Sequence, residues 1–236
     1  MKIWGMKFRW NSLECFFFVD LLLEKDAAEQ GMSCFPEDAT VRLEGGRTKK
    51  MKELQVGDKV ASLDVVTGRV VYSRVLTFLD IKPNSSNTFI TIRTKTPAAE
   101  VAITESHLIY QLNKQAQRET AVFARDLKVG DFVYVRHGAA LEKFTAGRVV
   151  GIEWNRGKGA YAPLTETGNL VVNNVLCSCY AMISDQRVAH WSFAPLRFAE
   201  WLFPGVAVHN SSGVHWYAQA LYKIYTSWNY VTTDRL

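Results

Sequence analysis

Cys34 is the residue at which this sequence first offers reactive chemistry. It lies in the stretch Gly31-Met-Ser-Cys-Phe-Pro36, where a segment of different composition gives way to a β-rich region. A thiolate is the strongest nucleophile that a side chain offers near neutral pH, so a cysteine at such a junction could attack the peptide bond just before it. The structural alternative is a small core residue, because free cysteines are among the most buried residue types.

Thr104 and His107 form a second candidate pair, three residues apart in Thr-Glu-Ser-His. They follow a strand-like run that ends at Ile103, and side chains at a strand end can address one site. The histidine could protonate a departing amine, and the threonine could hold the scissile amide by a hydrogen bond. Taken alone, the pattern also fits a structural histidine at the end of a strand.

Asp80 and Cys179 complete the set of polar candidates. Asp80 ends the apolar run from Val75 to Leu79. It is either a turn residue or, in a desolvated site, a general base with a raised pKa. Cys179 lies in an apolar stretch over residues 173–183 that predicts a buried strand, in which a core thiol is the simpler interpretation.

Composition narrows the classes of protein to be considered. The chain has 236 residues, of which 48% are hydrophobic, enough for one large domain or a domain with an appendage. The net charge of +5 is spread over short runs. The densest basic cluster, Arg47-Thr-Lys-Lys50, is predicted to be a solvated hairpin, so no nucleic-acid partner is expected. The protein is expected to be a monomer.

The cysteines argue against a disulfide scaffold and against a metal site. The sequence has four, Cys15, Cys34, Cys177 and Cys179, which are too few for disulfides to be the main stabilisation of a chain of this length. They include no ligand pairs at zinc-site spacing, so neither a structural metal nor a bound cofactor is predicted. No apolar run reaches the length of a membrane span.

Three segments follow from the order of the patterns. Residues 1–30 carry basic residues and then an apolar run, which is typical of a signal-like segment or a truncated upstream piece. Residues 31–185 are predicted to form a β domain, because short β-branched and aromatic runs alternate with Gly, Asn and Pro turns. Its predicted antiparallel strands are residues 40–43, 59–63, 69–76, 88–93, 100–103, 132–136, 148–152 and 170–173.

An internal repeat indicates a duplicated architecture. Leu54-Gln-Val-Gly-Asp58-Lys-Val60 is echoed by Leu127-Lys-Val-Gly-Asp131-Phe-Val133, and each copy leads into a predicted strand. Glycine supplies a positive φ and aspartate bonds its own backbone, as a tight turn requires. Two copies predict two β subdomains related by a pseudo-two-fold axis.

Residues 186–236 form an aromatic-rich tail. Helices are predicted over residues 188–194 and 196–203, broken at Pro195, and over residues 214–228. The last would place Tyr217, Leu221, Ile224 and Trp228 on one face. It is either an ordinary helix packed on the β core or an element for a lipid surface, where Trp and Tyr are favoured.

Together these motifs resemble the C-terminal autoprocessing region of hedgehog proteins, from about Gly31 nearly to the C-terminus. The resemblance rests on in-order motifs: Cys34-Phe-Pro, Leu54…Gly57-Asp58, Tyr72-Ser73, Leu76-Thr-Phe-Leu-Asp80, Thr104-x-x-His107-Leu, Ala160-Tyr-Ala-Pro-Leu-Thr165, Ser178-Cys179-Tyr-Ala, Ala189-His-Trp191, Ala194-Pro195-x-Arg197 and Gly213-Val-His-Trp-Tyr217.

The resemblance implies a mainly β, intein-like Hint fold and an autocatalytic reaction. Cys34 would attack the carbonyl of Ser33 to give an internal thioester, assisted by Thr104 and His107. Asp80 would activate the hydroxyl of cholesterol, a co-substrate that takes up the upstream polypeptide as an ester. Cys179 would be an accessory residue near the site.

The resemblance also assigns the tail. It would be the sterol-recognition region, in contact with a membrane surface, and the protein would act in the secretory pathway and outside the cell, in cell–cell signalling. Its candidate sterol contacts are Trp191, Trp201, Trp216, Tyr217, Leu221 and Trp228.

Two other interpretations stay open. Residues 206–211, Val-Ala-Val-His-Asn-Ser, resemble the C-terminal junction of a protein-splicing intein, with Asn210 as the cyclising residue. A degenerate module without catalysis is the other. Ser33 stands where the hedgehog family has glycine, and a side chain at that carbonyl is expected to slow the attack.

Overall fold

The computed structural model describes residues 35–113, 118–136, 143–181, 190–203, 205–206 and 212–221. Ser33, Cys34, Asn210 and Trp228 therefore lie outside the described residues, as do the predicted features of residues 1–30. Within the described ranges, no helix is both long and apolar enough to cross a membrane.

The described chain is mainly β, as the sequence predicts, and its twelve strands form one connected antiparallel network. The strands are β1 (Thr40–Arg42), β2 (Thr48–Lys50), β3 (Lys59–Asp64), β4 (Arg69–Lys95), β5 (Ala98–Ile103), β6 (His107–Asn113), β7 (Arg118–Phe123), β8 (Phe132–Arg136), β9 (Phe144–Thr165), β10 (Asn169–Val172), β11 (Val175–Ala181) and β12 (Gly213–Val214). Two 3₁₀ turns, η1 (Met51–Glu53) and η2 (Ala124–Asp126), and one helix, α4 (Ala194–Leu202), complete the named elements.

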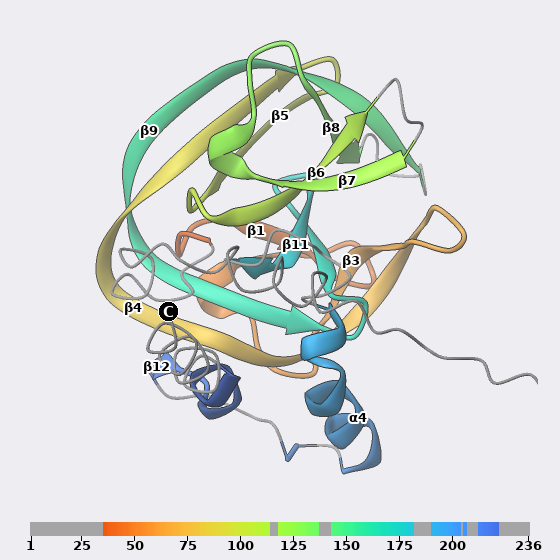
Figure 1. The fold of residues 1–236 in the computed structure, drawn as a ribbon, viewed down its shortest axis with the longest axis vertical. Coiled ribbons are helices and arrows are strands. Elements are labelled where there is room, and N and C mark those ends of the chain that lie inside the picture. Colours follow the sequence, from red (N-terminus) through yellow and green to blue (C-terminus); the bar gives the residue numbers. More distant parts are fainter. Residues whose placement is uncertain are drawn as a thin grey trace, which may run out of the picture.

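Two long strands, β4 and β9, run along each other around the rim of the molecule and carry the smaller strands (Figure 1). The sequence predicted two strands, residues 69–76 and 88–93, where the structure has the single strand β4. The predicted interruption between these two strands was wrong because β9 continues beside the intervening residues. The pairing passes from Lys82↔Ala160 to Ser86↔Lys158 with a register shift that absorbs the irregular residues.

The internal repeat builds the same turn twice, which confirms the predicted duplication. In the first copy Gly57 has φ +93° and donates its N–H to the Val75 carbonyl at 2.8 Å. In the second, Gly130 has φ +104° and donates to the Val149 carbonyl at 2.9 Å. Each glycine follows a 3₁₀ turn and precedes a strand that forms a hairpin with one end of a long arm, β3 with β4 and β8 with β9.

The core lies between these arms and the shorter strands. One large cluster joins both halves of the duplication and includes Phe35, Val75, Ile109, Val149 and Cys179. A smaller cluster, built on Leu63, Tyr110 and Leu176, lies apart from it. The basic stretch at residues 47–50 forms the hairpin of β1 and β2, as predicted.

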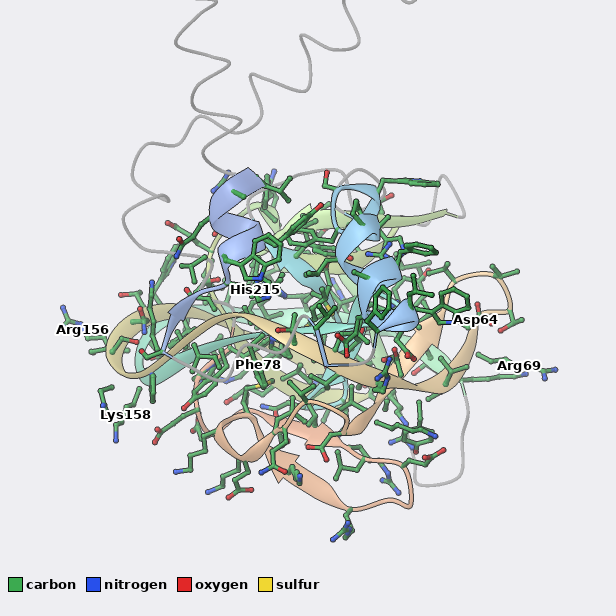
Figure 2. All side chains as sticks on the ribbon, turned by 90° about the horizontal axis from the view of Figure 1, so that it is seen from below. Asp64, Arg69, Phe78, Arg156, Lys158 and His215 are labelled. Atoms are coloured by element: carbon green, nitrogen blue, oxygen red, sulfur yellow. The ribbon has the colours of Figure 1, made fainter. Side chains whose placement is uncertain are left out.

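The tail packs against one end of the β domain. Residues 190–192 and α4 are helical, and Pro195 lies in the first turn of α4. The predicted interruption lies at Phe193, two residues before Pro195, because proline is tolerated in a first helical turn, where its missing N–H needs no partner. Val214 belongs to β12, and a helical segment over residues 216–221 follows. Figure 2 shows this segment and α4 side by side on the same side of the sheet.

Candidate active site

His107 begins β6 and is completely buried. Its Nε2 lies 2.9 Å from the carbonyl oxygen of Ser178 in β11. Because a carbonyl only accepts, Nε2 carries the proton and the neutral ring keeps a lone pair on Nδ1. Burial lowers the pKa of His107 to about 4, against the opposing effect of the Ser178 bond. Nδ1 has no hydrogen-bond partner among the described residues.

Phe35, the residue bonded to Cys34, packs against this imidazole. The two rings meet edge to face with centroids 4.7 Å apart, and Phe35 has no exposed surface. Its backbone is fixed by two bonds to Tyr161 in β9, N–H to carbonyl at 3.1 Å and the reverse at 3.0 Å. The described chain therefore enters the β domain beside His107.

Thr104 lies in the turn between β5 and β6, where the spacing placed it. Its carbonyl accepts the N–H of His107 at 3.1 Å, so the two residues belong to one tight turn. This turn sets the start of β6 and hence the position of the imidazole. Thr104 is half-buried, and its proposed contact to the scissile amide concerns residues outside the described ranges.

Asp80 lies within β4 and has no exposed surface, so the interpretation as a turn residue was wrong. A β-bulge surrounds it, because Phe78 pairs with Pro163 and Ile81 with Tyr161, which leaves Leu79 and Asp80 opposite one residue of β9. Its Oδ2 lies 3.4 Å from the Lys82 Nζ. Bulges next to functional sites re-aim side chains in this way.

Asp80 and His107 are connected through one row of paired residues. Tyr161 pairs with Ile81 on one side and with Phe35 on the other, and Phe35 contacts His107. Neighbouring strands lie about 4.8 Å apart, so Ile81 and Phe35 are separated by roughly 10 Å. This row links the strand that carries Asp80 to His107 through the residue that follows Cys34.

Cys179 lies in the buried strand β11, as predicted, directly after the residue that accepts the His107 bond. Its Sγ is 3.4 Å from the Thr165 hydroxyl, and 1% of the residue is exposed. Burial raises the pKa of Cys179 to about 11, so its thiol is protonated at neutral pH. Burial raises the pKa of Cys177 as well. Neither thiol is a nucleophile in this environment.

The tail residues divide into two groups. Trp191, Trp201 and Trp216 are 76%, 71% and 62% exposed. Tyr217 and Leu221 are partly buried and pack against the main core. The aromatic residues of the tail therefore include both a surface set and a set that fastens the tail to the β domain.

Sequence reasoning missed three buried or half-buried polar residues of the tail. His215 is completely buried where β12 meets β4, and Figure 2 shows it between the tail and the sheet. His190 Nδ1 and Arg197 Nη1 both contact the Tyr180 hydroxyl, at 3.1 and 2.8 Å. These contacts join residues distant in sequence. The only sequence signal was their place in the hedgehog-like motifs, which gave them no role.

No three His, Cys, Asp or Glu residues of the described ranges lie close enough together to hold a metal ion. The absence of a metal from the chemistry stays a prediction.

Comparison with known proteins agrees with this architecture. Residues 23–229 match the Hint module family. The Tiggy-winkle hedgehog protein of Danio rerio is 36% identical over 211 residues, which is 85% of this chain and 50% of that protein. The protein hedgehog of Drosophila yakuba is 37% identical over 205 residues, 81% of this chain and 43% of that protein. The chain thus spans about half the length of these curated relatives.

Solved intein structures share the fold. The Ssp DnaB mini-intein variant M86 has a TM-score of 0.52 and 12% identity, over 63% of this chain and 94% of that one. The TvoVMA intein has a TM-score of 0.51 and 18% identity, over 61% and 96%. The duplicated β subdomains and the buried histidine turn agree with the family match, which covers most of the chain. This chain therefore belongs to the Hint module family and is homologous to hedgehog proteins.

Proposed function

We propose that the chain is a hedgehog-type autoprocessing module. It cleaves the bond between Ser33 and Cys34 through an internal thioester and passes the upstream polypeptide to a sterol, with cholesterol as the expected co-substrate. The observation that supports this most directly is the buried His107. Its ring packs against the residue that follows Cys34, and its Nδ1 has no hydrogen-bond partner among the described residues.

In the first step the Cys34 thiol attacks the Ser33 carbonyl. The thiol proton passes to Nδ1 of His107, and the resulting imidazolium gives it to the departing amide nitrogen as the C–N bond breaks. The C–S bond forms and no proton is gained or lost. A site that lowers the pKa of His107 to about 4 makes the imidazolium a strong acid for this transfer. Thr104 would orient the amide.

In the second step the sterol hydroxyl attacks the thioester. The Asp80 carboxylate takes the hydroxyl proton, the new C–O bond forms, and the Cys34 sulfur leaves as a thiolate that is then reprotonated from Asp80. Burial of Asp80 supports this role, because a base shielded from bulk water discriminates against hydrolysis. The ammonium of Lys82, 3.4 Å from Oδ2, balances the carboxylate charge.

The tail is the proposed surface for the sterol and for a membrane. Phe198 and Trp201 of α4 lie with ring centroids 5.7 Å apart, and they are 61% and 71% exposed. Leu202 and Phe203 extend the same apolar patch. Exposed aromatic clusters of this kind mark contact sites for apolar ligands or lipid surfaces. A secretory and extracellular location, in the signalling role of hedgehog proteins, is part of the proposal.

Mass spectrometry of a fusion protein tests the proposal. A reporter is joined upstream of Gly31, and the N-terminal product is weighed after incubation with dithiothreitol or with cholesterol. A product that gains the mass of a sterol, and that disappears in Cys34→Ala, supports the proposal. An unmodified product under both conditions, or a spliced product that Asn210→Ala removes, would overturn it. The Ser33→Gly variant is expected to react faster because the carbonyl is less crowded.

A further inference from the structure

We propose that His215 is a positioning residue for the Asp80 carboxylate in the sterol step. The inference rests on the proposed function and deepens it, because the tail would then orient the general base in addition to binding the sterol.

The first observation is the pairing of β12 with β4. Gly213 is opposite Ile81 and Val214 is opposite Asp80. The N–H of His215 continues the ladder and donates to the Leu79 carbonyl at 2.9 Å. The two strand residues that form the Asp80 bulge are therefore both backed by the segment that ends in His215.

The second observation concerns the faces of the strand. In a regular strand, Leu79 and Asp80 would point to opposite faces. At this bulge the two residues share one partner position in β9, and both are buried, with exposed fractions of 1% and 0%. A bulge breaks the alternation and turns neighbouring side chains toward the same side. His215, opposite Leu79 and itself completely buried, belongs to that side.

The third observation fixes the tautomer of His215. Its Nδ1 accepts the N–H of Tyr217 at 3.0 Å, and its carbonyl accepts the N–H of Gln219 at 3.0 Å. His215 is thus the N-terminal cap of the helical segment 216–221. Because Nδ1 accepts, the proton of the neutral ring is on Nε2, which leaves His215 one side-chain donor to offer a carboxylate.

Through these three relationships His215 connects the helical segment of the tail to the strand that carries Asp80, the proposed base. Its backbone belongs to the β12–β4 ladder and its Nδ1 caps the tail helix. The proposal assigns its Nε2–H to the Asp80 carboxylate. A carboxylate whose orientation depends on a docked tail accepts protons efficiently only when the sterol-recognition segment is in place. The thioester step, centred on Cys34 and His107, does not depend on this connection.

The test separates the two chemical steps in the full-length reporter fusion. Cleavage by dithiothreitol reports thioester formation, and the cholesterol dependence of cleavage gives a maximal rate and a half-saturating sterol concentration. His215→Leu removes the Nε2 donor, and His215→Gln keeps an N–H donor near that position. The matched control is Gln219→Leu, which changes an exposed residue of the same helical segment 216–221.

His215→Leu is expected to lower the maximal sterol-dependent rate by about tenfold or more, with half-saturation and dithiothreitol cleavage changed by less than about twofold. His215→Gln should recover most of that rate, and Gln219→Leu should not reproduce the loss. In an Asp80→Asn background, His215→Leu should add nothing further.

Several results would overturn the inference. The inference fails if the maximal rate is unchanged in His215→Leu, or if the Gln and Leu variants have equal rates. It also fails if dithiothreitol cleavage is lost together with the sterol step, or if only the half-saturating sterol concentration changes. Failure of the proposed function is distinguishable, because the unaltered protein would then show no sterol dependence at all.

Discussion

The phenyl ring of Phe35 meets the His107 imidazole edge to face, with ring centroids 4.7 Å apart. Phe35 is the first described residue after Cys34. The contact joins a residue at the start of the domain to one at the start of β6. It restricts the ring plane of His107, whose Nε2 is already tied to the Ser178 carbonyl. Two constraints on one imidazole leave its Nδ1 with a defined direction, which is what a proton shuttle needs.

Phe35→Leu should therefore slow dithiothreitol-dependent cleavage by more than its effect on stability explains. The substitution removes the ring from a fully buried position and should lower the free energy of unfolding by about 1–3 kcal/mol. Without the ring edge, the imidazole gains freedom and the proton transfer loses alignment. Chemical denaturation and cleavage rates in the reporter fusion give the two quantities.

Leu176→Ala is the control, because Leu176 is fully buried in the smaller core cluster. Its truncation should lower the free energy of unfolding to an extent comparable with Phe35→Leu. If Phe35→Leu and Leu176→Ala slowed cleavage equally at equal stability, the ring contact would have no special effect on His107.

Folding stability should fall as the solution is acidified through the titration of His107. Its pKa is about 4 in the folded protein, against 6.5 for a solvated histidine such as that of an unfolded chain. Between these values the unfolded chain binds the extra proton, so the stability is present above pH 6.5 and is lost progressively toward pH 4. The full loss from this group is about 3 kcal/mol. Denaturation midpoints across this pH range measure it.

His107→Gln keeps a donor for the Ser178 carbonyl and cannot titrate, so it should flatten this pH dependence by close to one proton. His190 will still contribute in the variant, because burial lowers its pKa to about 4 as well. An unchanged pH profile in His107→Gln would show that folding does not shift the pKa of His107, and would contradict the prediction.

Cys177 and Cys179 should resist alkylation until the protein unfolds. Their exposed fractions are 0% and 1%, and burial raises both pKa values. With a pKa of about 11, Cys179 has only about one thiolate in a thousand at pH 8. Iodoacetamide labelling with peptide mass spectrometry, in a Cys15→Ser background, should modify neither residue before denaturant is added. Native labelling of Cys179 would contradict the buried, accessory role.

Local patterns in the sequence were enough for the β class, the repeat and most strands. The Leu-x-Val-Gly-Asp turns could be predicted because glycine with positive φ and a self-bonding aspartate are local properties. The continuity of β4 through Pro83 could not, since it depends on the pairing of Lys82 and Ser86 with β9. Tertiary pairing there joined two segments that the local pattern separated.

The site shows the same division. The turn of Thr104 and His107 lies within four residues and was readable from spacing. The Asp80 bulge and the packing of His215 arise from partners more than 75 residues away, in β9 and β12. No local pattern encodes those contacts. Cys34 lies outside the described residues, so its position relative to Thr104 stays a prediction.

The two repeat turns should differ in stability because, among the residues that the structure describes, only the first carries an ion pair. Asp58 and Asp131 each accept a backbone N–H at 2.8 Å, from Gln55 and Lys128. Asp58 also bonds the Lys49 ammonium at 2.8 Å. Alanine should cost about 1 kcal/mol at Asp131 and roughly 0.5 kcal/mol more at Asp58. Urea denaturation measures both, and Asp58→Asn should recover the turn contribution alone. If both alanine variants lost the same free energy of unfolding, the ion pair of Asp58 would make no contribution to stability.

The docking of the tail on β11 should depend on the absence of a side chain at Gly168. A Cβ there would lie 2.5 Å from His190 Nδ1 and 2.9 Å from the Tyr180 hydroxyl, the two groups that meet where the tail begins. Gly168→Ala should therefore displace residues 190–202 from the β domain. Hydrogen exchange should become faster in α4, and the sterol-dependent rate should fall while dithiothreitol cleavage persists.

Gly68→Ala is the matched control for backbone strain. Gly68 has φ +67°, against +73° at Gly168, and a Cβ there would meet nothing within 4 Å. Both variants place alanine in the left-handed region at a similar energetic cost, but only Gly168→Ala adds the clash with the tail. Hydrogen exchange of α4 that rises equally in the two variants would mean that the strain of the turn, and not the contact with His190 and Tyr180, governs the docking of the tail.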